Sequence, residues 1–168
     1  MSGPRVTSGR DSEQIVCTPR ELLDAVEARF GKLDFDLAAT ESNNVVGDDR
    51  GDSHFGPGSL WASDALSADA DWEITGNLWL NPPFGNIAPW AKKCAETPLS
   101  DDRRIFLLVP LTMANWACDY VHGRALVLGL NPRVMFVGHR TAFPKDLMIA
   151  VYGEIDVGFK PWRWKEKT

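Results

Sequence analysis

The sequence lacks the features that mark membrane, secreted and zinc-binding proteins. Its longest apolar run, residues 105–111, is far shorter than the ~20 residues that a membrane-spanning helix needs. Residues 1–15 are polar and contain no apolar signal core. Only three cysteines are present, Cys17, Cys94 and Cys118, and their wide spacing predicts neither a disulfide framework nor a paired zinc site. These absences favour a reducing, cytoplasmic compartment.

The chain also lacks an excess of basic residues. Its 168 residues carry 23 acidic and 18 basic side chains, for a net charge of −5. This balance argues against a non-specific nucleic-acid coat, since phosphate binding is mainly charge neutralisation, but it allows an enzyme that grips nucleic acid through one local patch. With 44% hydrophobic and 24% charged residues, the composition is typical of one globular domain. We expect a polar leader at 1–15, a domain at 16–158 and a basic, aromatic tail at 159–168.

The first regular element that the sequence predicts is a helix. Thr18 suits the N-cap, Pro19 the first helical position, and Glu21 the third position of a capping box. Apolar residues then recur at helical spacing as far as Phe30, and Gly31 supplies a stop signal.

Strands and helices alternate along the rest of the chain. Alternating apolar residues predict a strand at 33–37, and the polar stretch at 40–58 predicts a long loop. Further strands are predicted at 77–80, 105–109, 125–128, 134–137 and 147–152, and further helices at 87–96 and after a cap at Thr112. The alternation predicts an α/β fold with a largely parallel sheet.

The strongest chemical signal is Asn81-Pro82-Pro83-Phe84, directly after the apolar strand at 77–80. The exocyclic amine of a base is a poor nucleophile, because its lone pair is delocalised into the ring. The side-chain oxygen of Asn81 and the backbone carbonyl of Pro82 could accept both amine hydrogens and draw that lone pair out. The prolines fix the backbone that carries these acceptors, and Phe84 offers a face on which a flipped base could stack. A methyl donor in line with the amine would complete such a site, without a metal or a covalent intermediate.

The same four residues also suit an ordinary turn. Their location supports a site, since α/β folds bind ligands at the carboxyl ends of their strands. Asp36 lies at the end of the strand at 33–37 and could be either a cofactor ligand or a helix cap, and its position favours the ligand.

The 81–84 motif resembles the catalytic motif of amino-directed methyltransferases that use S-adenosylmethionine. The wider pattern is similar to the phage-type DNA N-6-adenine methyltransferases, often called phage Dam proteins. The segments that carry this resemblance are Thr18-Pro19, 35–39, 64–66, 78–84, Trp90, 107–110, 133–140 and Phe143. Together they extend over nearly all of the chain except the leader and the tail.

The resemblance implies a single Rossmann-like methyltransferase domain that binds S-adenosylmethionine, releases S-adenosylhomocysteine and needs no metal. It implies that Asn81, Pro82, Pro83 and Phe84 bind and activate the target adenine. The residues that it assigns to the cofactor are Thr18, Pro19, Asp36, Ala38, Asp64 and Leu66. The chain departs from the family pattern in one respect: the cofactor loop after Asp36 contains no glycine, although the small Ala38 and Ala39 allow close approach of the backbone.

Other candidates depend on less specific signals. Trp90 is expected near the substrate, and Arg140, with Arg133, is a candidate phosphate contact that an ordinary surface charge explains equally well. The three histidines show no metal-ligand spacing. The tail at 160–165 interleaves basic and aromatic groups, as single-strand binders do, and a docked strap explains it equally well.

The sequence therefore predicts transfer of a methyl group from S-adenosylmethionine to N6 of adenine in DNA. The expected setting is the cytoplasm of a bacterial host, with a phage or prophage gene and no membrane contact. No separate recognition domain fits, so recognition would fall to residues 40–58 and 112–124 or to a second subunit of a homodimer. Two alternatives stay open: a methyltransferase that acts on guanine N2 of RNA or on protein glutamine, and a binding module that keeps the fold but has lost the cofactor.

Overall fold

The computed structural model describes residues 17–39, 54–55, 64–67, 70–73, 76–100, 102–154 and 156–166. The predicted leader lies outside these residues, and so does the predicted loop at 40–58 except for His54 and Phe55. The helices are α2 (Arg20–Phe30), α3 (Ala88–Glu96) and α4 (Asn115–Tyr120). The strands are β1 (Leu33–Asp36), β2 (Asn77–Leu80), β3 (Ile105–Pro110), β4 (Leu126–Asn131), β5 (Leu147–Tyr152) and β6 (Gly158–Arg163).

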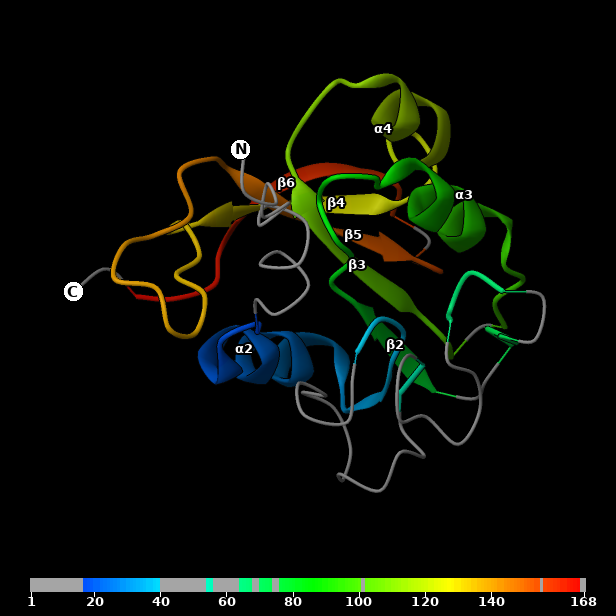
Figure 1. Ribbon diagram of the computed structural model, residues 1–168, viewed down its shortest axis with the longest axis horizontal. Coiled ribbons are helices and arrows are strands. Elements are labelled where there is room, and N and C mark those ends of the chain that lie inside the picture. The colour runs from blue at the N-terminus through cyan, green and yellow to red at the C-terminus, as the bar shows by residue number, and fades with distance from the viewer. Residues whose placement is uncertain are drawn as a thin grey trace, which may run out of the picture.

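The strands form one six-stranded sheet with the order β1-β2-β3-β5-β4-β6 (Figure 1). The pairs β1–β2, β2–β3 and β4–β6 are parallel, whereas β5 is antiparallel to both of its neighbours, β3 and β4. All strands except β5 therefore point in the same direction, which confirms the predicted mixed α/β fold with a mostly parallel sheet. The carboxyl ends of β1, β2, β3 and β4 consequently lie along one edge.

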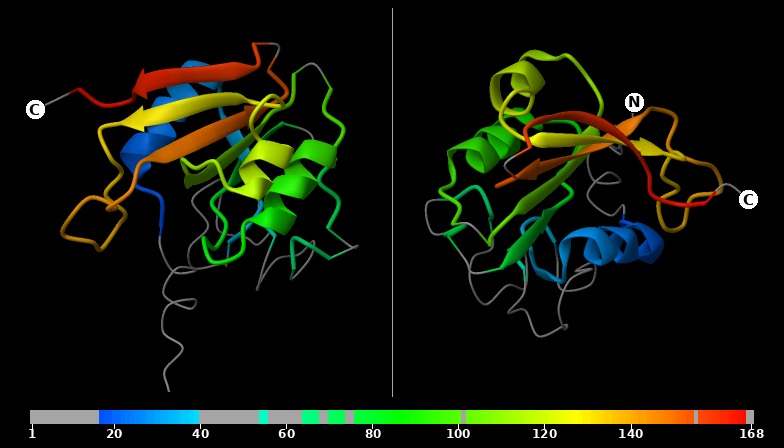
Figure 2. Two further views of the ribbon diagram at one scale, coloured as in Figure 1. Left: turned by 90° about the horizontal axis from the view of Figure 1, so that it is seen from above. Right: turned by 180° about the vertical axis from the view of Figure 1, so that it is seen from behind.

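Helices cover both faces of the sheet (Figure 2). On one face, α3 and α4 bury Ala91, Cys94 and Ala117 against side chains such as Leu78 and Leu107. On the other face, α2 contributes Leu22, Leu23 and Val26 to a core that also holds Trp79, Phe106 and Ile149. Successive residues of β2 and β3 enter opposite cores, so both strands are buried on both sides and read as unbroken apolar runs.

No helix in the described part of the chain is long and apolar enough to cross a membrane.

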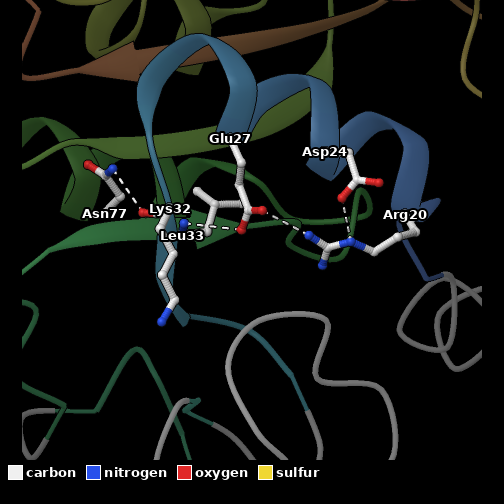
Figure 3. A network of polar contacts seen from close by, with 6 residues as sticks. All are labelled: Arg20, Asp24, Glu27, Lys32, Leu33 and Asn77. Carbon is white, nitrogen blue, oxygen red and sulfur yellow. Dashed lines mark hydrogen bonds and ion pairs between the residues drawn. The ribbon is translucent and has the colours of Figure 1, made fainter.

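The junction between α2 and β1 is held by a local polar network (Figure 3). Arg20 pairs with Asp24 at 2.7 Å and with Glu27 at 2.9 Å, and the other carboxylate oxygen of Glu27 accepts a hydrogen bond from the backbone N–H of Leu33 at 3.2 Å. Gly31 makes the reversal with φ of 101°, a conformation that favours glycine. The bond from Leu33 to Glu27 is the contact in this network that joins α2 to β1.

Four sequence predictions about elements were wrong. Thr112 does not cap α4, which begins at Asn115 with Ala114 as its N-cap residue and without a side-chain cap; the Thr112 hydroxyl accepts a hydrogen bond from the backbone N–H of Ala114 at 3.1 Å instead. Thr18 does not cap α2, which begins at Arg20 with Pro19 as its N-cap residue and without a side-chain cap. Residues 134–137 are not a strand: Val134 and Phe136 are buried and Met135 and Val137 are exposed, which gives a strand-like alternation, but the segment belongs to the connection between β4 and β5.

The fourth wrong prediction is the missed strand at the end of the chain, although the docked strap, one of the two interpretations of the tail, is confirmed. Among the strands of the described residues, β6 pairs with β4 alone, and it contains Pro161, a residue that a sheet tolerates on an edge strand but not in its interior. The tail is docked: Trp162 lies beside Arg29, and the indole N–H of Trp164 donates to the carbonyl of Pro132 at 2.7 Å. The predicted boundary at 158/159 therefore falls inside β6.

Candidate active site

Polar residues from three segments meet at the carboxyl ends of β1 and β2. β1 ends at Asp36, and the prolines at 82 and 83 prevent β2 from continuing past Leu80. Residues 17–19, directly before α2, cross this edge: the backbone carbonyl of Cys17 accepts a hydrogen bond from Val137 at 3.2 Å, and the side chain of Thr18 contacts Asn81.

Asn81 is held by a residue 63 positions away in the sequence. Its side-chain Nδ2 donates to Oγ1 of Thr18 at 3.2 Å. Thr18 is 3% exposed, Pro82 is buried, and Asn81 and Pro83 are half-buried. Nδ2 and Oδ1 branch from the same carbon of the carboxamide, so the bond to Thr18 occupies the Nδ2 branch and not the Oδ1 branch.

Asp36 is a buried carboxylate at the end of β1. It is 3% exposed, whereas Asp34 on the same strand is exposed. One of its oxygens accepts a hydrogen bond from the backbone N–H of Ala38 at 3.1 Å, and its carbonyl accepts one from Phe55 at 2.9 Å. A buried carboxylate is costly to keep charged unless a cation or hydrogen-bond donors compensate its charge. Buried carboxylates of this kind are typical of functional sites.

The pKa of the Cys17 thiol depends on the charge of Asp36. Burial raises the pKa of the Cys17 thiol above its ordinary value, and the negative charge of Asp36 raises that pKa further. Asp36 and residues 17–18 therefore share one environment, in which Thr18 also reaches Asn81. The structure thus brings together Thr18, Asp36 and Asn81 from the sequence-predicted set.

Phe84 belongs to a cluster of three aromatic rings. Its centroid lies 5.6 Å from that of Phe143 and 6.4 Å from that of Phe136, and both pairs are edge-on. Phe136 and Phe143 are themselves 5.8 Å apart at 90°. The connection 132–146 is therefore anchored to the 81–84 motif through Phe84, which is half-buried.

The same connection carries the predicted phosphate contacts. Arg140 is exposed, and Arg133 is exposed and pairs with Asp146 at 3.1 Å. Sequence reasoning did not predict that Phe136 and Phe143 support Phe84. Two signals were available: the resemblance, which includes 133–140 and Phe143, and the placement of these two aromatic residues on both sides of 137–142.

Asp64 and Leu66 lie in a turn that packs beside α3. Asp64 is exposed, and its side chain accepts a hydrogen bond from the backbone N–H of Leu66 at 2.9 Å. Lys93 of α3 holds this turn, because its ammonium donates to the carbonyls of Ala65 and Ala70, each at 2.9 Å. Burial lowers the pKa of Lys93 below its usual range, and nearby carboxylates oppose that change.

Trp90 packs against the same region. Its ring lies 6.4 Å from that of Trp72, and Lys93 lies 4.9 Å from the Trp72 ring centroid. Sequence reasoning missed Lys93, because a lysine on a helix normally indicates an exposed position. Within the described ranges, no group of three His, Cys, Asp or Glu side chains is arranged to hold a metal ion.

Comparisons with known proteins point to one family. A family model described as DNA N-6-adenine-methyltransferase (Dam) matches residues 7–165. A protein of Escherichia phage T1 named DNA N-6-adenine-methyltransferase is 29% identical over 93 residues, which make up 55% of this chain and 34% of that relative. The chain thus spans about a third of the length of the relative that it matches. No solved structure matches it.

Proposed function

This chain belongs to the DNA N-6-adenine-methyltransferase (Dam) family, and from that premise we propose that it transfers a methyl group from S-adenosylmethionine to the N6 amine of adenine in DNA. The observation that carries the proposal is the hydrogen bond between Asn81 and Thr18, at the end of β2 and close to the buried Asp36. A carboxamide held in this way is an acceptor prepared in advance for an amine.

The proposed chemistry depends on two acceptors for one amino group. Oδ1 of Asn81 and the carbonyl of Pro82 accept the two amine hydrogens, and the nitrogen lone pair becomes available as the amine leaves the ring plane. Positive charge develops on that nitrogen as its bond to the methyl carbon forms, and the same two oxygens stabilise it. The amine then releases one proton to solvent. S-adenosylmethionine, when bound, supplies the electrophilic methyl group of a sulfonium and leaves as S-adenosylhomocysteine.

The residues near Asp36 fit a cationic cofactor. A buried carboxylate matches the positive charges of S-adenosylmethionine better than it matches a neutral or anionic ligand. Ala38 is half-buried and Ala39 is buried, and their small methyl side chains would let a ligand approach the backbone after Asp36 more closely than larger side chains, in a loop without glycine. We assign Asp36, Ala38 and Pro19 to this cofactor region, and Asp64 and Leu66 to its adenine end through the turn that Lys93 holds.

The connection 132–146 supports DNA as the partner. Arg133, Arg140 and Lys145 are exposed on it, in a chain whose net charge is negative, and Phe84 ties it to the 81–84 motif. We propose that these cations contact phosphates while Phe84 stacks the flipped adenine. We also propose that Trp90, which lies on α3, contacts the substrate.

The sheet supports a Rossmann-like architecture. Three adjacent parallel strands, β1 to β3, lie between helices on both faces, and the proposed site is at their carboxyl ends. The phage relative supports a phage or prophage gene that acts in the cytoplasm of a bacterial host. A homodimer is the simplest way to widen recognition beyond the connection 132–146.

The substrate class is tested by competition. Equal masses of DNA, RNA and a glutamine-rich protein are incubated together with the chain and a methyl donor labelled on its methyl group, and the three polymers are then separated. The proposal expects the label in DNA. Label in RNA or in protein would contradict it, and a calorimetric titration without donor binding would favour a non-catalytic module.

Phe84 offers a test of base stacking against simple packing. Phe84→Leu removes two edge-on ring contacts, each worth about 0.5–1.5 kcal/mol, and also the aromatic face that would stack a base, worth about 1–3 kcal/mol in DNA binding. Phe143→Leu likewise removes two ring contacts but no stacking face. We expect similar falls in melting temperature for the two variants and weakened DNA binding for Phe84→Leu alone.

Phe84→Tyr completes this series. It keeps the aromatic face and should retain most DNA binding. A Phe84→Leu variant that binds DNA as tightly as Phe143→Leu would remove Phe84 from the base-binding site.

A further inference from the structure

We infer that Thr18 is a positioning residue for methyl transfer, which acts through Asn81 by holding the plane of its carboxamide. This inference rests on the proposed function of Asn81 as an amine acceptor. Sequence patterns give Thr18 a different role, as a helix cap, and the resemblance to phage Dam proteins gives it another, as a cofactor contact. The contact between Oγ1 of Thr18 and Nδ2 of Asn81, at 3.2 Å, suggests the positioning role instead.

The Thr18 side chain does not cap α2, although capping is the usual role of a threonine just before a helix. α2 has Pro19 as its N-cap residue and no side-chain cap hydrogen bond. The Thr18 hydroxyl is directed instead to the segment that follows β2, 63 residues later in the chain. A buried hydroxyl that makes a long-range bond to one proposed reactive side chain is a candidate for positioning.

The hydrogen bond between Asn81 and Thr18 restricts rotation of the Asn81 carboxamide, the motion that would move its oxygen away from the amine. A free asparagine side chain rotates about its last torsion over a broad range, so its oxygen would meet an incoming amine in only part of its conformations. A hydroxyl can donate as well as accept a hydrogen bond, so Thr18 can bond to either end of the Asn81 carboxamide and still hold its plane. The hydrogens of the incoming amine then favour the orientation in which the carboxamide oxygen faces them. In the structure, it is Nδ2 that bonds to Thr18.

The position of Thr18 is itself well fixed. Cys17 accepts a hydrogen bond from the backbone of Val137 on one side, and on the other the carbonyl of Pro19 accepts hydrogen bonds from the backbone N–H groups of Leu22 and Leu23 in the first turn of α2. The hydroxyl is therefore carried by a segment that is anchored at both ends. Such anchoring is what distinguishes a positioning group from a side chain that merely finds a partner.

The test is Thr18→Val, which keeps the shape of the side chain and removes the hydroxyl. We expect kcat to fall about 2- to 12-fold, the value of one ordinary hydrogen bond, with the Kd for S-adenosylmethionine unchanged. Thr18→Ser keeps the hydroxyl and should restore kcat. Thr97→Val is the matched control, because its hydroxyl bonds locally to the Lys93 carbonyl at 2.6 Å. Melting curves for all three variants check the fold.

A double-mutant cycle separates positioning from cofactor binding. If Thr18 acts through Asn81, Thr18→Val should cost nothing further in the Asn81→Ala background. An unchanged kcat in Thr18→Val, a weaker Kd for S-adenosylmethionine, or an equal cost in both backgrounds would overturn the inference. If Asn81→Ala itself keeps the normal rate, the proposed function of Asn81 fails, whereas a slow Asn81→Ala beside a normal Thr18→Val contradicts the positioning role alone.

Discussion

Replacing Asn81 by Ala is expected to lower the rate of methyl transfer by about 10²–10³-fold, with little change in the affinity for S-adenosylmethionine. The reason is that the side chain supplies one of two acceptors aimed at the amine, while the proposed cofactor contacts lie on other segments. The measurement is a single-turnover rate at saturating donor, together with a donor titration. Because Asn81 is only half-buried, we expect its truncation to cost little stability, so a fall of this size reports on the chemistry.

The matched control for this variant is Asn86→Ala, five positions along the chain. Asn86 is exposed in the turn that precedes α3, so the variant should keep both rate and stability. Methylation by Asn81→Ala at the normal rate would contradict the proposed mechanism. An equal loss in Asn86→Ala would show that the 81–84 region responds to any truncation.

Asp36→Asn is expected to weaken binding of S-adenosylmethionine by about 10- to 150-fold, the value of one hydrogen bond to a charged group. The amide retains an oxygen for the backbone N–H of Ala38, so the local turn should survive. Calorimetry with the donor is the direct measurement. Asp34→Asn on the same strand is the control: Asp34 is exposed and accepts a hydrogen bond from the backbone of Asn77 at 2.8 Å, which the amide can keep.

Cys17 provides an internal check on the Asp36 variant. The Asp36 charge is one of two causes that raise the pKa of the Cys17 thiol, so its removal should lower that pKa and increase the thiolate fraction at a given pH. Alkylation of Cys17, measured in a Cys118→Ser background because Cys118 is exposed, should therefore become faster. Faster alkylation with an unchanged donor affinity would move the cofactor site away from Asp36.

The sequence predicted the strands that carry the site better than it predicted the contacts between them. β2, β3 and β5 are buried on both faces, so their apolar runs have one simple interpretation. Residues 134–137 show the limit of such patterns: alternation reports which side chains are buried, and a connection packed against a sheet produces the same alternation as an edge strand.

Thr18 shows why local rules failed at the site. Thr, Pro and Glu at these spacings describe a capping box, and nothing in the local sequence records that a hydroxyl is directed to a residue 63 positions away. Asp36 is a related case, because its burial follows from the packing of β1 beside β2 and residues 54–55 rather than from the alternation of its strand. Long-range contacts of this kind are where functional sites depart from sequence patterns.

The most direct test of the central claim is the identity of the methylated atom. Mixed-sequence DNA is incubated with the full chain and S-adenosylmethionine, digested to nucleosides and analysed, with Asn81→Ala in parallel. We predict N6-methyladenine from the native chain, with the yield at early times reduced about 10²–10³-fold for Asn81→Ala. A methyl group on cytosine or on a ring nitrogen of adenine, or equal yields from the two proteins, would contradict it.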